Sequence, residues 1–127
     1  MDTEHILRTL NDHSVDYVAV AGALSPAPSR CDLSILIDDT AANRMELNFA
    51  LQDLFCECAD EAEKWKPVPD IPVWLEEAVL HPLKSPYGSL CVLRALEGLA
   101  GDFAEVKAKA QIKAMQDGEM YYELSAL

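Results

Sequence analysis

Two short apolar runs in the first third of the chain constrain its fold more than any other feature. Residues 17–21 read YVAVA and end at Gly22, and residues 33–37 read LSILI. Runs of this length that end at turn residues are typical of buried β-strands. The connection between them contains Pro26 and Pro28, which leave little room for a regular helix. The sequence therefore predicts two buried strands joined by an irregular segment.

Segments with apolar residues at helical spacing predict helices around these strands. Three of them begin at a residue whose side chain can cap a helix N-terminus. The expected helices are residues 3–12 with a cap at Thr3, residues 41–63 with a cap at Asp39 or Thr40, a short turn at residues 73–77, and a last helix that begins at Asp102 and ends at Gly118. The residues expected to face inward from the second and last helices are Met45, Phe49, Leu54, Phe103, Val106, Ala110 and Ala114.

A hairpin is expected in the second half of the chain. Residues 79–83 and 90–95 are suited to strands, and Pro86 and Gly88 of SPYGS supply the turn between them. Residues 120–124 are expected to close the sheet as an edge strand.

Length and composition indicate a single domain. The chain has 127 residues, of which 50% are hydrophobic and 25% are charged, as is ordinary for a globular protein. We therefore expect one domain over residues 1–127, of the α/β (α+β) class. Its small mixed sheet should have about five strands, with helices packed against it.

The charge of the chain bears on its partners. Twenty-two acidic residues against ten basic ones give a net charge of −12. Nucleic-acid binding depends on lysine and arginine displacing counterions from phosphates, so we expect no nucleic-acid partner. No apolar run approaches the roughly 20 residues of a membrane helix, and the acidic, amphipathic MDTEHILRTLNDH is unlike a signal peptide. We therefore expect no membrane association and a cytoplasmic location.

Four cysteines stand at positions 31, 56, 58 and 91. Their spacing matches neither a paired CxxC zinc framework nor a dense disulfide scaffold. The spacing favours small buried thiols in a reducing compartment. A different interpretation stays open, in which Cys56 and Cys58 form a soft-metal site that carries zinc.

Three stretches of the chain occur in an order that is typical of one enzyme superfamily. They are ILRTLNDHSVDYVAVAG, SRCDLSILIDDTAANRMELNFAL and SPYGSLCVLRALEGLAGDFAEVKAKA. Together they resemble the nucleotidyltransferase superfamily, in particular small bacterial proteins related to the nucleotidyltransferases of toxin–antitoxin pairs. The first stretch is similar to the helix and strand that lead into the family's glycine turn. The middle stretch is similar to its carboxylate-bearing strand and following helix, and the last stretch to its final carboxylate hairpin. The resemblance spans nearly the whole chain and implies a nucleotidyltransferase-like fold.

That family's chemistry depends on three carboxylates. Two divalent cations, about 4 Å apart, hold the attacking and leaving oxygens during nucleotidyl transfer. Mg²⁺ prefers carboxylate oxygens, and two aspartates at positions i and i+2 of a strand point to the same face and can bind both ions. A third carboxylate comes from a neighbouring strand. A glycine turn and the helix after it offer backbone N–H groups to the triphosphate.

The chain keeps one of the three carboxylates that the resemblance implies. Asp32 matches the first, whereas Ser34 stands at the second position and Cys91 at the third. A neutral hydroxyl or a soft thiol does not replace a carboxylate as a ligand of Mg²⁺. Asp38 lies about 20 Å farther along the strand, too far to share a metal pair, and Asp38 and Asp39 suit the N-terminus of the following helix instead. No metal site is therefore expected, and Asp32 is interpreted as vestigial.

The nucleotide-binding positions are partly kept as well. Gly22 matches the glycine turn, but Ala23 replaces the other small residue there. Arg30 matches the arginine of the family motif and would contact a phosphate, or else pair with one of the many acids. A simpler role for Asp32 is to hydrogen-bond the loop around it.

Two functional interpretations follow. In the first, the chain is a nucleotidyltransferase-fold protein that has lost metal-dependent transfer and acts by binding a protein or a nucleotide, with no cofactor. Its acidic surface would suit a basic partner, and an exposed edge strand would support a homodimer. In the alternative, it is an active nucleotidyltransferase that uses Mg²⁺ to modify a small molecule or a protein.

Overall fold

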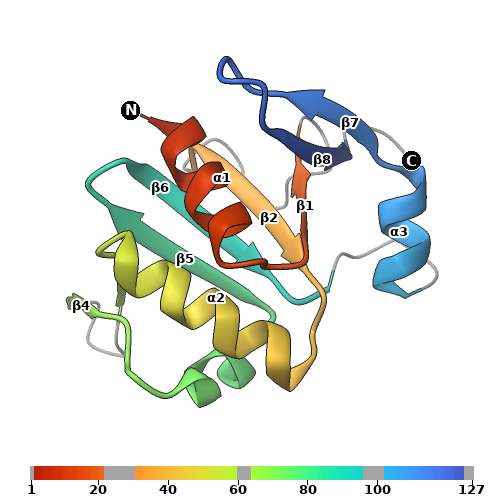
Figure 1. Cartoon of the computed structure of the whole chain (residues 1–127). Helices are drawn as coiled ribbons and strands as arrows, with labels where there is room; N and C mark the ends of the chain where they lie inside the picture. Colours follow the sequence, from red (N-terminus) through yellow and green to blue (C-terminus); the bar gives the residue numbers. More distant parts are fainter. Residues whose placement is uncertain (1, 22–30, 60–63, 96–101, 125–127) are drawn as a thin grey trace.

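The structure is a computed structural model of the whole chain, and it describes residues 2–21, 31–59, 64–95 and 102–124. Its central feature is a mixed sheet of eight strands in the order β4-β3-β5-β6-β2-β1-β8-β7 (Figure 1). The sheet is larger than the small sheet of about five strands expected from the sequence, although the α+β class agrees. The strands are β1 (Tyr17–Val20), β2 (Leu33–Ile37), β3 (Glu57–Ala59), β4 (Trp65–Pro67), β5 (Leu80–Ser85), β6 (Gly88–Leu93), β7 (Gln111–Ala114) and β8 (Met120–Leu124).

The centre of the sheet agrees with the strands predicted from the sequence. β1 and β2 pair antiparallel, β2 and β6 pair parallel, and β5 and β6 form the expected hairpin. β1 is buried at every residue, and β2 at every residue after its first, so both faces of these two strands are largely covered. The parallel pairing of β2 with β6 brings together residues that are far apart in the sequence.

α1 (Thr3–Asp12) and α2 (Ala41–Asp53) form a layer on one face of the sheet, and the short helix α3 (Phe103–Lys109) lies beside β8 (Figure 1). The leucines of α1 and α2 pack on Ile35, Ile37 and Val92. α3 covers part of the other face, where Val106 packs with Leu36 and Leu93. The short 3₁₀ helix η2 (Pro72–Glu77) includes the turn expected at 73–77. No helix in the described ranges is long and apolar enough to cross a membrane.

The inward stripe of α2 differs from the expected one. Met45 and Phe49 are 51% and 48% exposed, whereas Asn43, Leu47 and Leu51 are buried. These buried residues of α2 are also spaced four apart, as expected, but the first of them is an asparagine. The prediction for Met45 and Phe49 was wrong because it followed apolar character, whereas the fold buries an amide whose hydrogen bonds are satisfied.

Asn43 has three hydrogen-bond partners besides its helix. Its Oδ1 accepts from the Asp16 amide at 2.7 Å, and its Nδ2 donates to the carbonyls of Asp16 and Asp38 at 2.9 and 2.7 Å. The buried amide therefore joins the start of α2 to the segments that precede β1 and follow β2.

Two expected helix ends are also corrected. α2 ends at Asp53 and not at residue 63, and β3 follows almost at once. The last helix ends at Lys109, and Ala114 is an exposed residue of β7 and not an inward-facing helical one. Residues 120–124 form a strand as predicted, but β8 pairs with both β1 and β7, so β7 is the edge. At the N-terminus the cap of α1 is Asp2 and not Thr3.

Candidate functional site

Ser34 and Cys91, at the second and third carboxylate positions of the resemblance, lie side by side. They are register partners in the parallel pair of β2 and β6. Both point toward the face that carries α3, because Ile35 and Val92, their neighbours along the strands, pack on the opposite face. Ser34 is 3% exposed and Cys91 is 1% exposed. The positions that resemble a metal site therefore meet in space, but they meet in the interior.

A disulfide joins Cys91 to Cys31, which precedes Asp32 in the sequence. The two cysteines are 60 residues apart, with their Cα atoms 6.0 Å apart. The expectation of free thiols was therefore wrong for this pair, because the pairing of β2 with β6 brings the two positions together. Neither sulfur of this bond is a thiolate that could bind a metal.

Asp32 hydrogen-bonds the start of β6. Its Oδ2 accepts from the backbone N–H of Ser89 at 2.9 Å and from the Ser89 hydroxyl at 3.2 Å. The Asp32 amide donates to the same hydroxyl at 2.9 Å. The carboxylate thus joins the residue before β2 to β6, which is the simpler of the two roles considered for it.

The residues present do not fit a two-metal site. Asp32 supplies one carboxylate, Ser34 supplies a buried hydroxyl, and the sulfur of Cys91 is bonded to Cys31. Mg²⁺ needs hard oxygen ligands with negative charge, and one exposed carboxylate does not provide them. Within the described part of the chain, no group of three or more His, Cys, Asp or Glu side chains is arranged to hold a metal ion. Gly22, Ala23 and Arg30, the expected nucleotide-binding residues, lie outside the described residues.

A charged cluster lies at the other end of β2. Asp39 accepts hydrogen bonds from Arg44 at 2.7 Å and from Arg94 at 3.0 Å, and Arg44 also pairs with Glu76 at 3.2 Å. These contacts connect α2, η2 and the residue after β6. Thr40 caps the N-terminus of α2, which confirms one of the two caps predicted there, whereas the interpretation of Asp38 and Asp39 as helix caps was wrong.

The environment of Asp39 makes the stability of the protein depend on pH. Burial alone would raise its pKa, but hydrogen bonds from Arg94 and Arg44 outweigh burial and hold the pKa below its ordinary value of 3.8. A lowered folded-state pKa means that the stabilisation is complete above 3.8 and is lost as the pH falls through the folded-state value.

We expect Asp39→Asn to lower the free energy of unfolding by about 1 kcal/mol at neutral pH, because the pairs are partly exposed to solvent. Below the folded-state pKa of Asp39, which is lower than 3.8, the wild-type carboxyl is itself neutral and the substitution should have almost no effect. Urea denaturation at the two pH values measures the difference. An equal loss of unfolding free energy at both pH values would show that the charge of Asp39 contributes nothing to stability.

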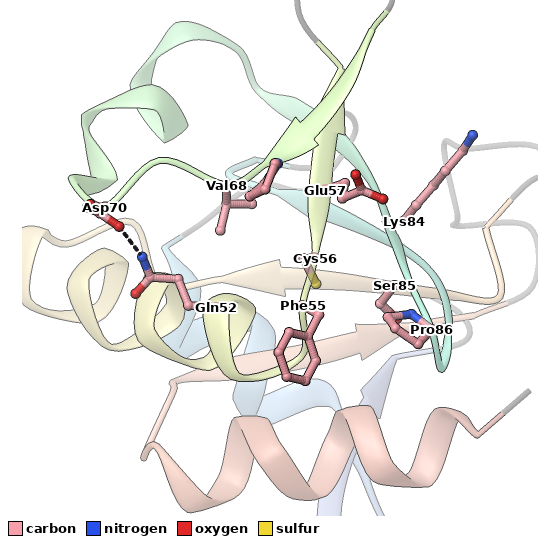
Figure 2. Close-up of a pocket in the computed structure, with 10 residues that line it drawn as sticks. Gln52, Phe55, Cys56, Glu57, Val68, Asp70, Lys84, Ser85 and Pro86 are labelled. Atoms are coloured by element: carbon pink, nitrogen blue, oxygen red, sulfur yellow. Dashed lines mark hydrogen bonds between the residues drawn. The ribbon is translucent and has the colours of Figure 1, made fainter.

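A pocket of about 740 Å³ opens beside the C-terminal end of α2 (Figure 2). It lies between that helix end, β3, the segment after β4 and the turn of the β5–β6 hairpin. Its apolar lining residues include Phe55, Cys56, Val68 and Pro86. Glu57 and Asp70 add carboxylates, and Asp70 accepts a hydrogen bond from Gln52 at 2.9 Å. Its volume lies within the range of small-molecule pockets, and its lining does not include Ser34 or Cys91.

Phe55 gives this pocket an unusual wall. The Phe55 amide donates to Gln52 O, and the Cys56 amide donates to Leu51 O, which is the hydrogen-bond pattern of a Schellman helix end. Such an end requires a left-handed residue, usually glycine, and Phe55 has φ 55°. Ser14 has the same place and conformation at the end of α1, with φ 57°. Phe55 is 69% exposed, so packing of its ring compensates little of the backbone strain.

We expect Phe55→Gly to raise the free energy of unfolding by about 1 kcal/mol, because glycine adopts the left-handed conformation without a Cβ clash. Phe55→Ala is the matched control. It removes the same ring but keeps the Cβ, so it should bring no gain. Thermal and urea unfolding of the two variants measure the difference. A larger loss for the glycine variant than for the alanine variant would contradict the strain argument.

The two cysteines outside the disulfide differ in burial. Cys56 is 2% exposed, and burial raises the pKa of its thiol to about 12, so it is protonated at neutral pH. Cys58 is half-buried on β3. The soft-metal interpretation stays a prediction, because within the described residues no third His, Cys, Asp or Glu joins Cys56 and Cys58 in a group that could hold an ion.

Sequence reasoning missed the pocket and Phe55. The run LQDLFCECA contains neither glycine nor proline to mark the end of α2, so the pattern predicted that the helix continues through Phe55. No signal in the sequence distinguishes this left-handed phenylalanine from a helical one.

No family model, no curated protein and no solved structure matches the chain. The resemblance to nucleotidyltransferases therefore depends on the chain's own motifs, and no relative supports it.

Proposed function

We propose that this chain is a nucleotidyltransferase-like protein that has lost metal-dependent transfer and acts by binding. The observation that carries the proposal is the Cys31–Cys91 disulfide, which includes Cys91, the residue that the resemblance aligns with the third carboxylate. A disulfide beside a buried hydroxyl has no negative charge for Mg²⁺, so the chemistry of the resembled family has no ligand set here.

The arrangement of the strands supports the resemblance. In the family pattern the third carboxylate comes from a strand next to the one that bears the first two. Here β6 lies next to β2, and Cys91 is the register partner of Ser34. This pairing agrees with that one feature of the family pattern, and the proposal assigns neutral residues to two of its three carboxylate positions.

A protein partner fits this chain better than a nucleotide does. The pocket beside α2 is lined by the carboxylates of Glu57 and Asp70, which would repel a triphosphate. Lys84 also lines the pocket, but its ammonium lies 4.1 Å from the centre of the Trp65 ring. The net charge of −12 favours a basic partner.

Restoring the missing carboxylates tests the proposal. The variant Cys31→Ala, Ser34→Asp, Cys91→Asp places aspartate at both lost positions and removes the disulfide. The control Cys31→Ala, Cys91→Ala removes the disulfide alone. Binding of Mn²⁺ is measured by the decrease in the electron paramagnetic resonance signal of the free ion. Circular dichroism confirms that each variant is folded.

We expect the aspartate variant to bind Mn²⁺ and the control and the wild type to bind none at the same concentration. Binding by the wild type equal to that of the aspartate variant would favour the alternative, an active metal-dependent enzyme. A folded aspartate variant that binds no Mn²⁺ would contradict the assignment of Ser34 and Cys91 to the carboxylate positions.

A further inference from the structure

Among the residues that the structure describes, β7 (Gln111–Ala114) is the last strand of the sheet, and no described strand pairs with its outer edge. All four of its residues are exposed, and β8 is its pairing partner on one side. The opposite edge of the sheet, β4, has three residues, including Pro67, which has no N–H to offer. An incoming strand would therefore meet proline at β4 but unblocked backbone at β7.

The hydrogen bonds of the β7–β8 hairpin fix which backbone groups of β7 point outward. The Met115 amide donates to Glu119 O at 2.7 Å, so this pair is a bonded one in an antiparallel ladder. Bonded and non-bonded pairs alternate, so Lys113 and Gln111 also bond to β8. The N–H and C=O groups of Ile112 and Ala114 therefore point away from the sheet.

The β1–β8 pairing gives an independent check of this alternation. Ala21 N–H donates to Leu124 O at 3.0 Å, so Leu124 bonds toward β1 and its neighbour Glu123 bonds toward β7. Gln111 is the register partner of Glu123. The two observations agree that Gln111 is bonded inward and that Ile112 is directed outward.

We propose that β7 pairs antiparallel with β7 of a second copy of this chain, with Ile112 opposite Ile112 on the two-fold axis. In this register the two isoleucines exchange both of their outward N–H and C=O groups, and Lys113 of each copy faces Gln111 of the other. No two like charges stand directly opposite each other. The pairing is self-complementary, as a two-fold interface requires.

Side chains on one face of the ribbon favour the same partner. Ile112 and Met120 are each 61% exposed, and both lie on the face that holds Ala114 and Tyr122. Two copies joined at Ile112 would place these side chains on one continuous face, with the isoleucines in contact across the axis.

The local charge also permits a second copy to approach here. Between residues 107 and 124 three lysines balance three carboxylates, whereas the whole chain has 10 basic and 22 acidic residues. Two strongly acidic chains repel each other least where their charge is balanced. Dimer formation through β7 would be one form of the proposed binding role. It does not depend on whether the metal ligands are lost, so the Mn²⁺ experiment and the dimer experiment can fail independently.

Sedimentation equilibrium tests the pairing. The wild type should show a concentration-dependent mass that approaches twice the 14.0 kDa of one chain. Ile112→Lys should weaken the association at least tenfold, because two lysines would meet on the axis. Ile71→Lys, which changes an isoleucine that is 68% exposed elsewhere, should leave it unchanged. A wild type that stays monomeric, or an Ile112→Lys variant that dimerises as well as the wild type, would overturn the proposal.

A cross-linking experiment tests the register. Paired residues of a bonded antiparallel pair have Cα atoms about 5.5 Å apart, which suits a disulfide. Ile112→Cys should therefore form a covalent dimer rapidly under mild oxidation. Ala114→Cys should not, because the two copies of that residue would be about four residues out of register. Wild-type protein under the same oxidation gives the background from its own cysteines, and equal cross-linking of both variants above that background would overturn the stated register.

Discussion

Reduction of the Cys31–Cys91 disulfide is expected to lower the free energy of unfolding by about 4 kcal/mol. The bond joins residues 60 apart in the sequence, and closing a loop of that length removes this much chain entropy from the unfolded state. Urea denaturation with and without a thiol reductant measures the loss.

The variant Cys31→Ala is the control for this measurement. Cys31 is only half-buried, so alanine leaves a smaller gap there than it would at Cys91, which is 1% exposed. The variant should have the reduced stability in both buffers and should not respond to reductant. The disulfide would be contradicted if the urea midpoint of the wild type were the same with and without reductant and if four thiols reacted after denaturation without reductant.

The disulfide also bears on where the protein functions. Thiols of cytosolic proteins are kept reduced, whereas disulfides persist in oxidising compartments. The cytoplasmic location expected from the sequence stays a prediction, and this bond argues against it. Counting free thiols in protein taken directly from its native source, alkylated at lysis, decides between the two.

Asn48→Leu is expected to lower the free energy of unfolding by about 3 kcal/mol. Asn48 is 2% exposed, and its Oδ1 accepts from Trp74 Nε1 at 2.8 Å. Its Nδ2 donates to the carbonyls of Pro69 and Asp70 at 2.9 and 3.2 Å. Leucine keeps the volume but leaves buried polar groups without partners, and each such group costs about 1–3 kcal/mol.

A double-mutant cycle separates the lost hydrogen bond from lost packing. Trp74→Phe removes the indole N–H, so the pair Asn48→Leu, Trp74→Phe should cost less than the sum of the single changes. Additive losses in urea denaturation would show that the Asn48–Trp74 bond contributes nothing. Because Asn48 also holds the backbone of Asp70, the wall of the pocket depends on it.

The centre of the fold was predictable from local pattern, but its edges were not. YVAVA and LSILI are short apolar runs between turn residues, and β1 and β2 occur where these runs predict them. In contrast, AKAQIKA has helical propensity, yet Gln111–Ala114 form a strand because β8 offers a pairing partner. Tertiary pairing outweighed local propensity there.

The candidate site was likewise predictable only in part from the sequence. The adjacency of Ser34 and Cys91 follows from the motif order, and β2 and β6 do pair at these residues. The bond between Cys31 and Cys91 could not be predicted from the sequence, because disulfide connectivity depends on which strands pair in the fold. The pocket beside Phe55 could not be predicted either, because its walls come from three separate segments of the chain.

The measurement that tests the central claim most directly is a calorimetric titration of the oxidised wild-type protein. ATP, CTP, GTP and UTP are each added with Mg²⁺, with Mn²⁺ and with neither ion. A protein that has lost its metal ligands should give the same result with and without the ion for every nucleotide. Metal-dependent binding at micromolar affinity, about −8 kcal/mol, would contradict the account and would make the chain a candidate active nucleotidyltransferase.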